Sequence, residues 1–149
     1  MDLYLMRHGE AGEARFDAER PLTPRGLAQA SASAQGLKRL NAKVPVIHHS
    51  PYARATQTAG AVAAVFGSRL VAVDWLTPAA SPDAAAEALI ALREGAFVVA
   101  HMPILPGILD ILCGARVSFP TAAVAQILVS GGSGVLGGLW TSELLERVR

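Results

Sequence analysis

The sequence predicts an α/β fold: a three-layer α/β/α sandwich whose sheet is mostly parallel with an antiparallel edge strand. Short apolar runs alternate with longer segments of helical spacing, an alternation typical of a sheet covered by helices on both faces. A glycine-rich turn at residues 130–134 separates the last two apolar runs and favours antiparallel pairing of these strands. Apolar residues make up 52% of the 149 residues, which suits a packed globular core.

Capping residues and the spacing of apolar residues place each element. Thr23 and Pro24 are typical of an N-cap and a first helical residue, and Gly67 and Gly114 are expected to end two helices. In the first helix, a three-to-four spacing predicts an apolar face made of Leu27, Ala30, Ala34, Leu37 and Leu40. The expected elements are a strand at 3–6, helix at 24–40, strand at 44–49, helix at 52–66, strand at 70–75, helix from 82 to about Glu94, strand at 97–100, helix at 103–113, and strands at 124–129 and 135–140.

Composition and charge narrow the class of protein. The net charge is +1, which gives no broad electrostatic case for binding nucleic acid or an acidic membrane. Cys113 is the only cysteine, so an intramolecular disulfide is impossible and a reducing cytoplasm is the simplest location. The N-terminus does not resemble a signal peptide. We expect one cytoplasmic domain over residues 1–149, without a nucleic-acid or membrane partner and with its oligomeric state open.

Unusual residues follow three of the predicted strands. Arg7 and His8 come directly after the first strand, Arg54 lies on the first turn of the helix that follows the second, and His101 ends the strand at 97–100. Ligands of open α/β sheets bind beyond the carboxyl ends of the strands. Segments almost fifty residues apart are therefore expected to bring a histidine or an arginine to one edge of the sheet.

These residue types suit phosphoryl transfer. A phosphoryl group carries spread negative charge, and its transfer depends mostly on positioning and on electrostatic stabilisation. The planar guanidinium of arginine binds two phosphate oxygens and stays charged. A neutral imidazole nitrogen acts as a nucleophile, and a second imidazole donates hydrogen bonds to the transferred group.

Four sequence blocks carry a resemblance to a known family. They are Met6-Arg7-His8-Gly9-Glu10-Ala11, Arg20-Pro21-Leu22-Thr23-Pro24-Arg25-Gly26, Ser50-Pro51-Tyr52-Ala53-Arg54-Ala55-Thr56-Gln57-Thr58 and Ala100-His101-Met102-Pro103. With these blocks, in this order and spacing, the chain resembles the histidine phosphatase superfamily, also called phosphoglycerate mutase-like. Within it, the chain looks most similar to the small SixA-type phosphohistidine phosphatases.

The resemblance implies a role for each matching residue. His8 would be the phosphorylated nucleophile, Arg7 and Arg54 would hold the phosphoryl oxygens, and His101 would be the second essential histidine. Arg20 is implied as a further phosphate or substrate contact, with Gly9 and Met102 beside the two histidines as other candidates. Neither a metal nor a cofactor is implied. Ala100 stands where relatives often have serine, and Trp75 lies where an acidic residue is common.

The sequence specifies the general acid and the substrate less closely than the nucleophile and the phosphate-binding arginines. Glu10 is the nearest candidate acid along the chain, and His101 is the alternative. An imidazole leaving group needs little help, because its conjugate acid has a pKa near 6.5, whereas an alkoxide is harder to expel. The short chain also leaves little material for a lid. Both arguments favour phosphohistidine in a protein as the substrate.

Other interpretations of the same residues stay open. One alternative function is that of a small-molecule phosphomonoesterase on the same core, acting on a small phosphorylated molecule. Another is that of a non-catalytic phosphate-binding interaction module. Arg20 alternatively forms a surface ion pair with Asp17 or Glu19. We interpret His48 and His49 as structural, because adjacent strand residues point to opposite faces. Cys113 is expected to pack as a small hydrophobe.

Overall fold

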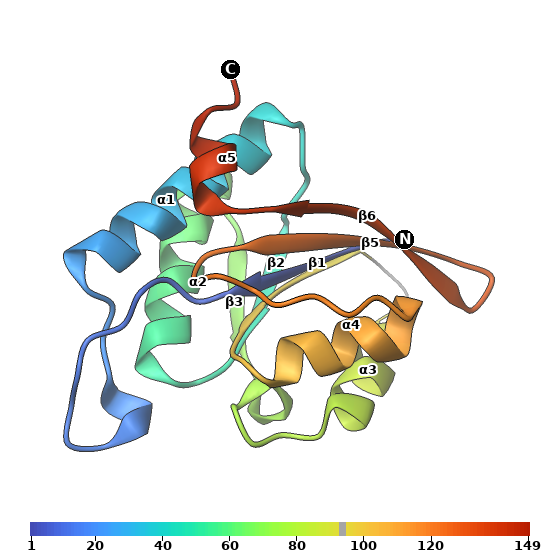
Figure 1. Cartoon of the computed structure of the whole chain (residues 1–149), viewed down its shortest axis with the longest axis horizontal. Coiled ribbons are helices and arrows are strands. Elements are labelled where there is room, and N and C mark those ends of the chain that lie inside the picture. Colours follow the sequence, from blue (N-terminus) through green and yellow to red (C-terminus); the bar gives the residue numbers. More distant parts are fainter. Residues whose placement is uncertain (93–94) are drawn as a thin grey trace.

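A six-stranded mixed sheet forms the centre of the protein (Figure 1). The computed structural model describes residues 1–92 and 95–149. The strands are β1 (Asp2–Arg7), β2 (Val46–His49), β3 (Arg69–Ala72), β4 (Ala96–Ala100), β5 (Val124–Ser130) and β6 (Ser133–Trp140), in the order β3-β2-β4-β1-β5-β6. The α-helices are α1 (Pro24–Arg39), α2 (Ala53–Phe66), α3 (Pro82–Ala91), α4 (Ile104–Cys113) and α5 (Ser142–Glu146).

The strand pairing confirms the predicted mostly parallel sheet. β1, β2, β3 and β4 pair in parallel, whereas β5 runs antiparallel to both β1 and the edge strand β6. The reversed strand is therefore β5, one position inside the edge. Between β5 and β6, Gly131 and Gly132 both have positive φ, the backbone that a tight two-residue hairpin requires.

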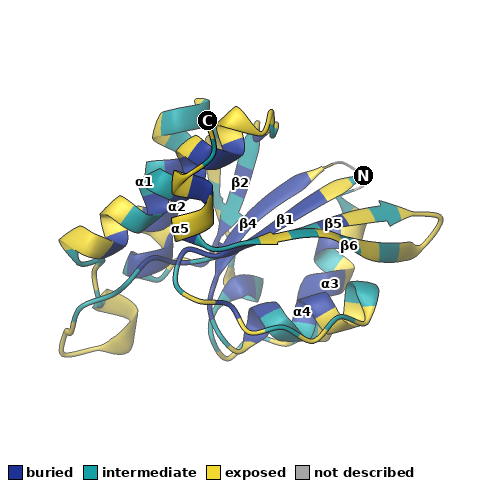
Figure 2. Cartoon of the chain, turned by 45° about the horizontal axis from the view of Figure 1, so that its top comes forward, coloured by how far each residue is buried: buried dark blue, intermediate teal, exposed yellow. Residues whose placement is uncertain are grey.

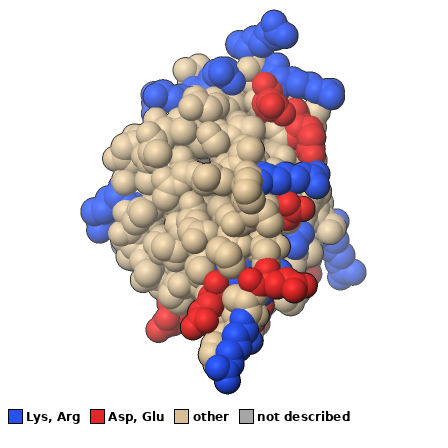
Figure 3. All heavy atoms as spheres, turned by 90° about the vertical axis from the view of Figure 1, so that its left-hand side faces the viewer, with Lys and Arg blue, Asp and Glu red and all other residues tan. Residues whose placement is uncertain are grey.

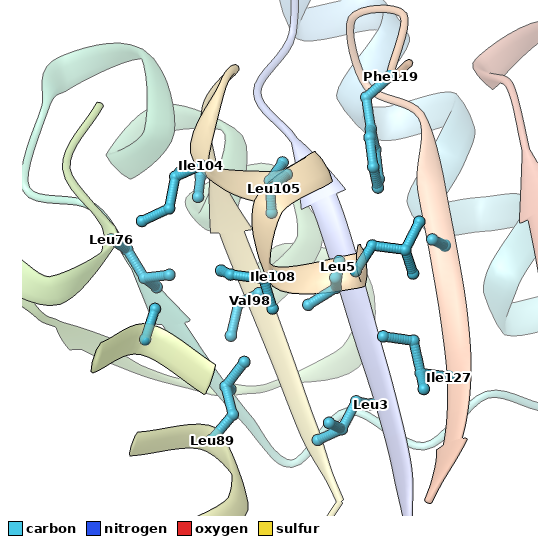
Figure 4. Close-up of a cluster of buried hydrophobic side chains, with 14 of the residues drawn as sticks. Leu3, Leu5, Leu76, Leu89, Val98, Ile104, Leu105, Ile108, Phe119 and Ile127 are labelled. Atoms are coloured by element: carbon cyan, nitrogen blue, oxygen red, sulfur yellow. The ribbon is translucent and has the colours of Figure 1, made fainter. Parts of the chain in front are cut away.

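Side chains of β1 alternate between two cores, one on each face of the sheet. Leu3 and Leu5 pack with α3 and α4 (Figure 4), whereas Tyr4 and Met6 pack with α1, α2 and α5. Successive strand residues point to opposite faces, so one strand joins both layers. Figure 2 shows β1 and β4 as largely buried strands in the middle of the sheet. This gives the expected three layers.

Most predicted element ends agree with the structure. The hydroxyl of Thr23 accepts a hydrogen bond from the backbone N–H of Gly26 at 3.0 Å, which caps α1. Gly67 and Gly114 end α2 and α4 with φ values of 69° and 70°, in the left-handed region that favours glycine.

Several predicted features are wrong in detail. β3 ends at Ala72, and Trp75 lies in a 3-10 turn (Asp74–Leu76) that follows the strand. α3 ends at Ala91, and the predicted end at Glu94 lies outside the described residues. Leu27 and Leu40 are exposed. They lie off the buried stripe of α1, which is made of Gly26, Ala30, Ser33, Ala34 and Leu37.

Two short elements have no counterpart in the prediction. α5 begins after Thr141, whose hydroxyl accepts a hydrogen bond from the N–H of Leu144 at 3.3 Å. A 3-10 turn, Asp17–Glu19, interrupts the loop between β1 and α1. Within residues 1–92 and 95–149, every helix is too short or too polar for a transmembrane span.

Candidate active site

The two histidines that follow β1 and β4 face each other at the carboxyl edge of the sheet. β4 pairs directly with β1, and the N–H of His8 donates to the carbonyl of Ala100 at 3.1 Å. The rings of His8 and His101 lie 5.2 Å apart between centroids. Arg54 follows β2 on the first turn of α2, and β2 is the other neighbour of β4. The fold therefore brings these three residues together, as the sequence predicted.

His8 presents one ring nitrogen as a free base. Its Nδ1 lies 2.7 Å from the carbonyl oxygen of Gly9. A carbonyl only accepts hydrogen bonds, so Nδ1 carries the proton and Nε2 keeps its lone pair. Burial lowers the pKa of His8 to about 4; the hydrogen bond to Gly9 opposes this shift, while the charges of Arg54 and Arg7 add to it. The ring is neutral at pH 7 and suited to nucleophilic attack.

Arg54 is buried, and its two terminal nitrogens contact Asp17 in the loop before α1. Its Nη1 donates to the backbone carbonyl of Asp17 at 2.7 Å, and its Nη2 lies 3.2 Å from the Asp17 carboxylate. The guanidinium also lies over the ring of Tyr52, 5.3 Å from its centroid. Nε of Arg54 is buried and has no hydrogen-bond partner among the described residues.

Arg7 is anchored in a similar way from the other side. Its Nη1 donates to the carbonyl of Phe119 at 2.8 Å, and its Nε is buried without a partner in the described part of the chain. Burial lowers the pKa of Arg7, and the positive charge of Arg54 lowers it further. The two guanidinium groups are therefore close enough to repel each other, which an anion between them would relieve.

His101 is the most buried of the four central residues. Its Nε2 lies 2.8 Å from the hydroxyl of Ser50, and its Nδ1 is buried with no partner among residues 1–92 and 95–149. Burial lowers the pKa of His101 to about 3, helped by the proximity of His8 and Arg54. His101 is therefore neutral at pH 7.

Asp17 joins this group as a residue that the sequence did not single out as functional. Its carboxylate also lies 3.2 Å from Nη1 of Arg20, and Nε of Arg20 donates to the carbonyl of Gly12 at 2.9 Å. Burial alone would raise the pKa of Asp17, but hydrogen bonds to Arg20 and Arg54 outweigh it and hold the pKa below its usual value. In the sequence, only its position three residues before Arg20 indicated that Asp17 forms an ion pair.

The remaining predicted contacts lie beside the site in different ways. The N–H of Gly9 already donates to the hydroxyl of Thr58 at 3.0 Å. The carboxylate of Glu10 accepts from the Thr23 hydroxyl at 2.8 Å and lies 3.5 Å from Arg25, so the structure does not join Glu10 to the two histidines. Met102 is half-buried against the core formed with α4.

The pair His48 and His49 has no ligand geometry in the structure. Nδ1 of His49 donates to the carbonyl of Ser50 at 2.8 Å, whereas the ring of His48 lies 6.1 Å from that of Trp75. Within the described residues, no three histidine, cysteine, aspartate or glutamate side chains are grouped as metal ligands. Cys113 is half-buried, with Sγ 3.3 Å from the carbonyl of Leu109.

Charge on this edge of the molecule is mixed. Figure 3 faces the end of the sheet at which β1 terminates and shows acidic and basic side chains interspersed, mostly toward the rim. The attraction for an anion therefore comes from the arginines of the site itself, since no large area of one sign surrounds it.

Comparisons with known proteins agree with this geometry. The model of the histidine phosphatase superfamily (branch 1) matches residues 3–77. The chain is 31% identical over 144 residues to the phosphohistidine phosphatase SixA of Escherichia coli K12, covering 90% of this chain and 89% of that protein.

Solved structures give the same result. A structure of the protein histidine phosphatase SixA complexed with tungstate superposes with a TM-score of 0.91 at 27% identity, covering 95% of this chain and 97% of that one. A phosphoserine phosphatase of Entamoeba histolytica shares the fold alone, with a TM-score of 0.74 at 18% identity over 97% and 98% of the two chains. The fold is therefore phosphoglycerate mutase-like, and the chain belongs to the histidine phosphatase superfamily, branch 1, and is a phosphohydrolase.

Proposed function

We propose that this phosphohydrolase removes the phosphoryl group from phosphohistidine in proteins, with His8 as the nucleophile. One observation carries the proposal. The neutral His8 ring is close to Arg7, Arg54 and His101. Each of these residues has a buried nitrogen without a partner in the described chain, namely Nε of Arg7, Nε of Arg54 and Nδ1 of His101. Unpaired buried polar groups are costly, and a tetrahedral oxyanion next to His8 supplies an acceptor for such groups.

The reaction takes two displacements. Nε2 of His8 attacks phosphorus, and the bond from phosphorus to the substrate nitrogen breaks, with its electron pair leaving on that nitrogen. Arg7, Arg54 and His101 bind the phosphoryl oxygens during this step. Water then attacks the phosphorylated His8, releases inorganic phosphate and restores the neutral ring.

The contacts of the nearby acids favour a nitrogen leaving group. Glu10 is engaged by Thr23 and Arg25, and Asp17 has a lowered pKa, which makes it a poor proton donor at neutral pH. An imidazole leaving group takes up a proton from water readily near neutral pH, whereas an alkoxide requires an acid. The site is therefore better suited to phosphohistidine than to phosphate esters.

The relatives support the same substrate. The curated relative of 31% identity is a phosphohistidine phosphatase, and the SixA structure with a TM-score of 0.91 was obtained with tungstate, a tetrahedral oxyanion shaped like phosphate. We extend both properties to this chain. In our proposal Arg20, Gly9 and Met102 lie at the substrate side of one catalytic domain (residues 1–149) that acts in the cytoplasm.

Trapping of the phosphorylated enzyme tests the nucleophile. We expect wild-type protein treated with a phosphohistidine protein to give an acid-labile phosphoenzyme, and His8→Gln to give none and to lose activity. His48→Gln is the matched control, because His48 lies within β2 and its ring packs beside that of Trp75, not beside His8 or His101. Full activity of His8→Gln would refute the proposal.

A substrate comparison tests the specificity. Since general acid catalysis contributes about 10²–10⁴-fold, we expect kcat/KM for a phosphohistidine protein to exceed that for sugar phosphates and phosphoserine peptides by about 100-fold. Faster hydrolysis of a small phosphate ester would instead assign the protein as a small-molecule phosphomonoesterase. Vanadate binding without turnover of any substrate would assign a binding module.

A further inference from the structure

The hydroxyl of Ser50 lies next to the ring of His101, the second histidine of the site. Ser50 is completely buried at the end of β2. Its hydroxyl oxygen accepts a hydrogen bond from the backbone N–H of Tyr52 at 3.2 Å and lies 2.8 Å from Nε2 of His101. A serine hydroxyl has one proton to donate and two lone pairs to accept with. The Tyr52 N–H uses one lone pair, so the proton of the hydroxyl still needs an acceptor.

Among the described residues, the ring nitrogen of His101 is the acceptor that the structure gives this hydroxyl. We infer that Ser50 is a positioning residue which donates its proton to Nε2 of His101 and thereby fixes the tautomer with hydrogen on Nδ1. The inference rests on the proposed function in one respect: the group that Nδ1 addresses is taken to be the transferred phosphoryl.

The tautomer decides whether His101 attracts or repels an oxyanion. With hydrogen on Nδ1, the buried nitrogen that lacks a partner is a donor, as phosphoryl oxygens require. In the other tautomer the same nitrogen presents a lone pair to a negative group. A protonated ring would carry hydrogen on both nitrogens, but the lowered pKa keeps His101 neutral at pH 7 with a single N–H. A neighbouring group must therefore select which nitrogen carries that hydrogen.

The backbone around Ser50 is held from both sides, so the hydroxyl is fixed before substrate arrives. The N–H of Ser50 donates to the carbonyl of Val99 on β4 at 3.1 Å. Its carbonyl accepts from Nδ1 of His49 at 2.8 Å and from the hydroxyl of Thr56 at 3.4 Å. Such preorganisation removes the need to reorient a donor during the reaction.

Nitrogen-15 NMR of the histidine rings in the full wild-type chain tests the assignment directly, without substrate. At pH 7 we expect His101 to show a protonated Nδ1 and an unprotonated, hydrogen-bonded Nε2. A protonated Nε2 would overturn the inference. This readout does not depend on which substrate is hydrolysed, so the proposed function and the tautomer assignment fail or succeed separately.

Variants then test the consequence. We expect Ser50→Ala to mix the two tautomers of His101 and to lower kcat about 10- to 100-fold with KM changed less than about threefold. Ser50→Thr keeps the hydroxyl, and we expect it to restore the Nδ1–H tautomer and most of kcat. Wild-type NMR still decides if either variant fails to fold.

Ser68→Ala is the matched control. Ser68 precedes β3 at the opposite edge of the sheet, and its hydroxyl donates to the carbonyl of Val44, so the variant loses a similar hydrogen bond far from the site. We expect wild-type kcat and an unchanged His101 spectrum. Unaltered kcat and tautomer in Ser50→Ala, or an equal loss of kcat in Ser68→Ala, would contradict the positioning role.

Discussion

The carboxylate of Asp17 lies 3.2 Å from Nη2 of Arg54 and 3.2 Å from Nη1 of Arg20. One acidic side chain at the exposed rim thus joins a buried arginine to a half-exposed one. The backbone carbonyl of Asp17 holds Arg54 as well, at 2.7 Å. Arg54 is therefore positioned by the main chain, whereas the carboxylate places a negative charge beside the guanidinium that is proposed to bind the phosphoryl group.

We expect Asp17→Asn to bind oxyanions more tightly. The amide keeps the backbone contact to Arg54 but removes a negative charge that faces the arginines. Because the Asp17 side chain is 57% exposed, the ion pair contributes at most about 1 kcal/mol to stability, so folding should change little. We predict that the Kd for vanadate falls about threefold, measured by inhibition of phosphatase activity, since exposed ion pairs of this kind are worth under about 1 kcal/mol.

Glu19→Gln is the control for this prediction. Glu19 lies in the same 3-10 turn, and its loss removes an equal charge without breaking a contact to Arg54. An unchanged Kd in Glu19→Gln is expected. Weaker vanadate binding by Asp17→Asn would show that the carboxylate orients Arg54 instead of competing with the ligand.

Arg54→Lys should lower kcat/KM strongly although the charge is kept. Lysine cannot donate simultaneously to Asp17 and, through a second fixed N–H, to an oxyanion. Loss of one preorganised donor to a developing charge costs about 10²–10³-fold in rate. We therefore predict a drop of about 100-fold or more in kcat/KM for a phosphohistidine protein. Arg39→Lys at the end of α1 serves as the control, and equal losses in both variants would contradict the role of the Arg54 guanidinium.

The His8 ring should titrate far below an ordinary histidine. Its pKa is lowered to about 4 by burial, with Arg54 and Arg7 contributing, so the neutral nucleophile persists well below pH 6.5. NMR titration of the ring in the free enzyme is expected to give a midpoint near 4, and the acid limb of kcat/KM should follow that midpoint. A midpoint near 6.5 would contradict the assigned environment of His8.

His8 and His101 should make the stability of the protein depend on pH. His8 and His101 have folded-state pKa values of about 4 and about 3, below the unfolded value near 6.5. Between these values the unfolded chain binds more protons, so stability is fully present above pH 6.5 and is lost as pH falls toward 4. Each histidine contributes a slope of at most about 1.4 kcal/mol per pH unit.

Urea unfolding at pH 7, 6 and 5 measures this slope. His101→Gln should have a shallower pH dependence than wild type, because one of the histidines with a lowered pKa is absent. His48, whose pKa burial also lowers, contributes equally in both proteins and does not affect the comparison. The Asp17 carboxyl, with its lowered pKa, acts only at more acidic pH and does not mask the effect. A free energy of unfolding that stays constant from pH 7 to 5 would contradict the burial of both rings as neutral groups.

Local patterns explain why much of the fold was predictable. Thr23 with Pro24 marks the start of α1, and Gly67 and Gly114 mark helix ends, because each signal lies within a few residues of its effect. α5 carries no such periodic signal, since its five residues are too few to show one. Leu27 was misplaced because small residues such as Gly26 and Ala30 set the buried stripe, which hydrophobicity alone does not reveal.

The site was predictable where residue type implies chemistry. His8, Arg54 and His101 end three segments that parallel strands bring to one edge, so their meeting follows from topology. The partners that orient them do not follow in this way. Asp17 contacts Arg54 through its backbone carbonyl as well as its side chain, and Ser50 reaches His101 only because β2 pairs with β4. These relationships depend on strand order and loop path, which local sequence does not encode.

Close packing of Gly26 against the catalytic loop gives a final prediction. A Cβ on Gly26 would lie 2.0 Å from the backbone oxygen of Glu10, and a Cβ on Gly9 would lie 2.3 Å from the backbone oxygen of Gly26. Gly26→Ala must therefore push α1 away from the loop that holds His8. We expect a loss of about 1–3 kcal/mol in stability together with reduced kcat.

Gly60→Ala is the matched control. Gly60 lies inside α2 with nothing within 4 Å of its Cβ position, so alanine should stabilise the helix by about 0.5–1 kcal/mol. Urea unfolding and kcat of both variants measure the difference. Equal effects of the two substitutions would mean that the contact between α1 and the His8 loop is not tight, and the site would then not depend on it.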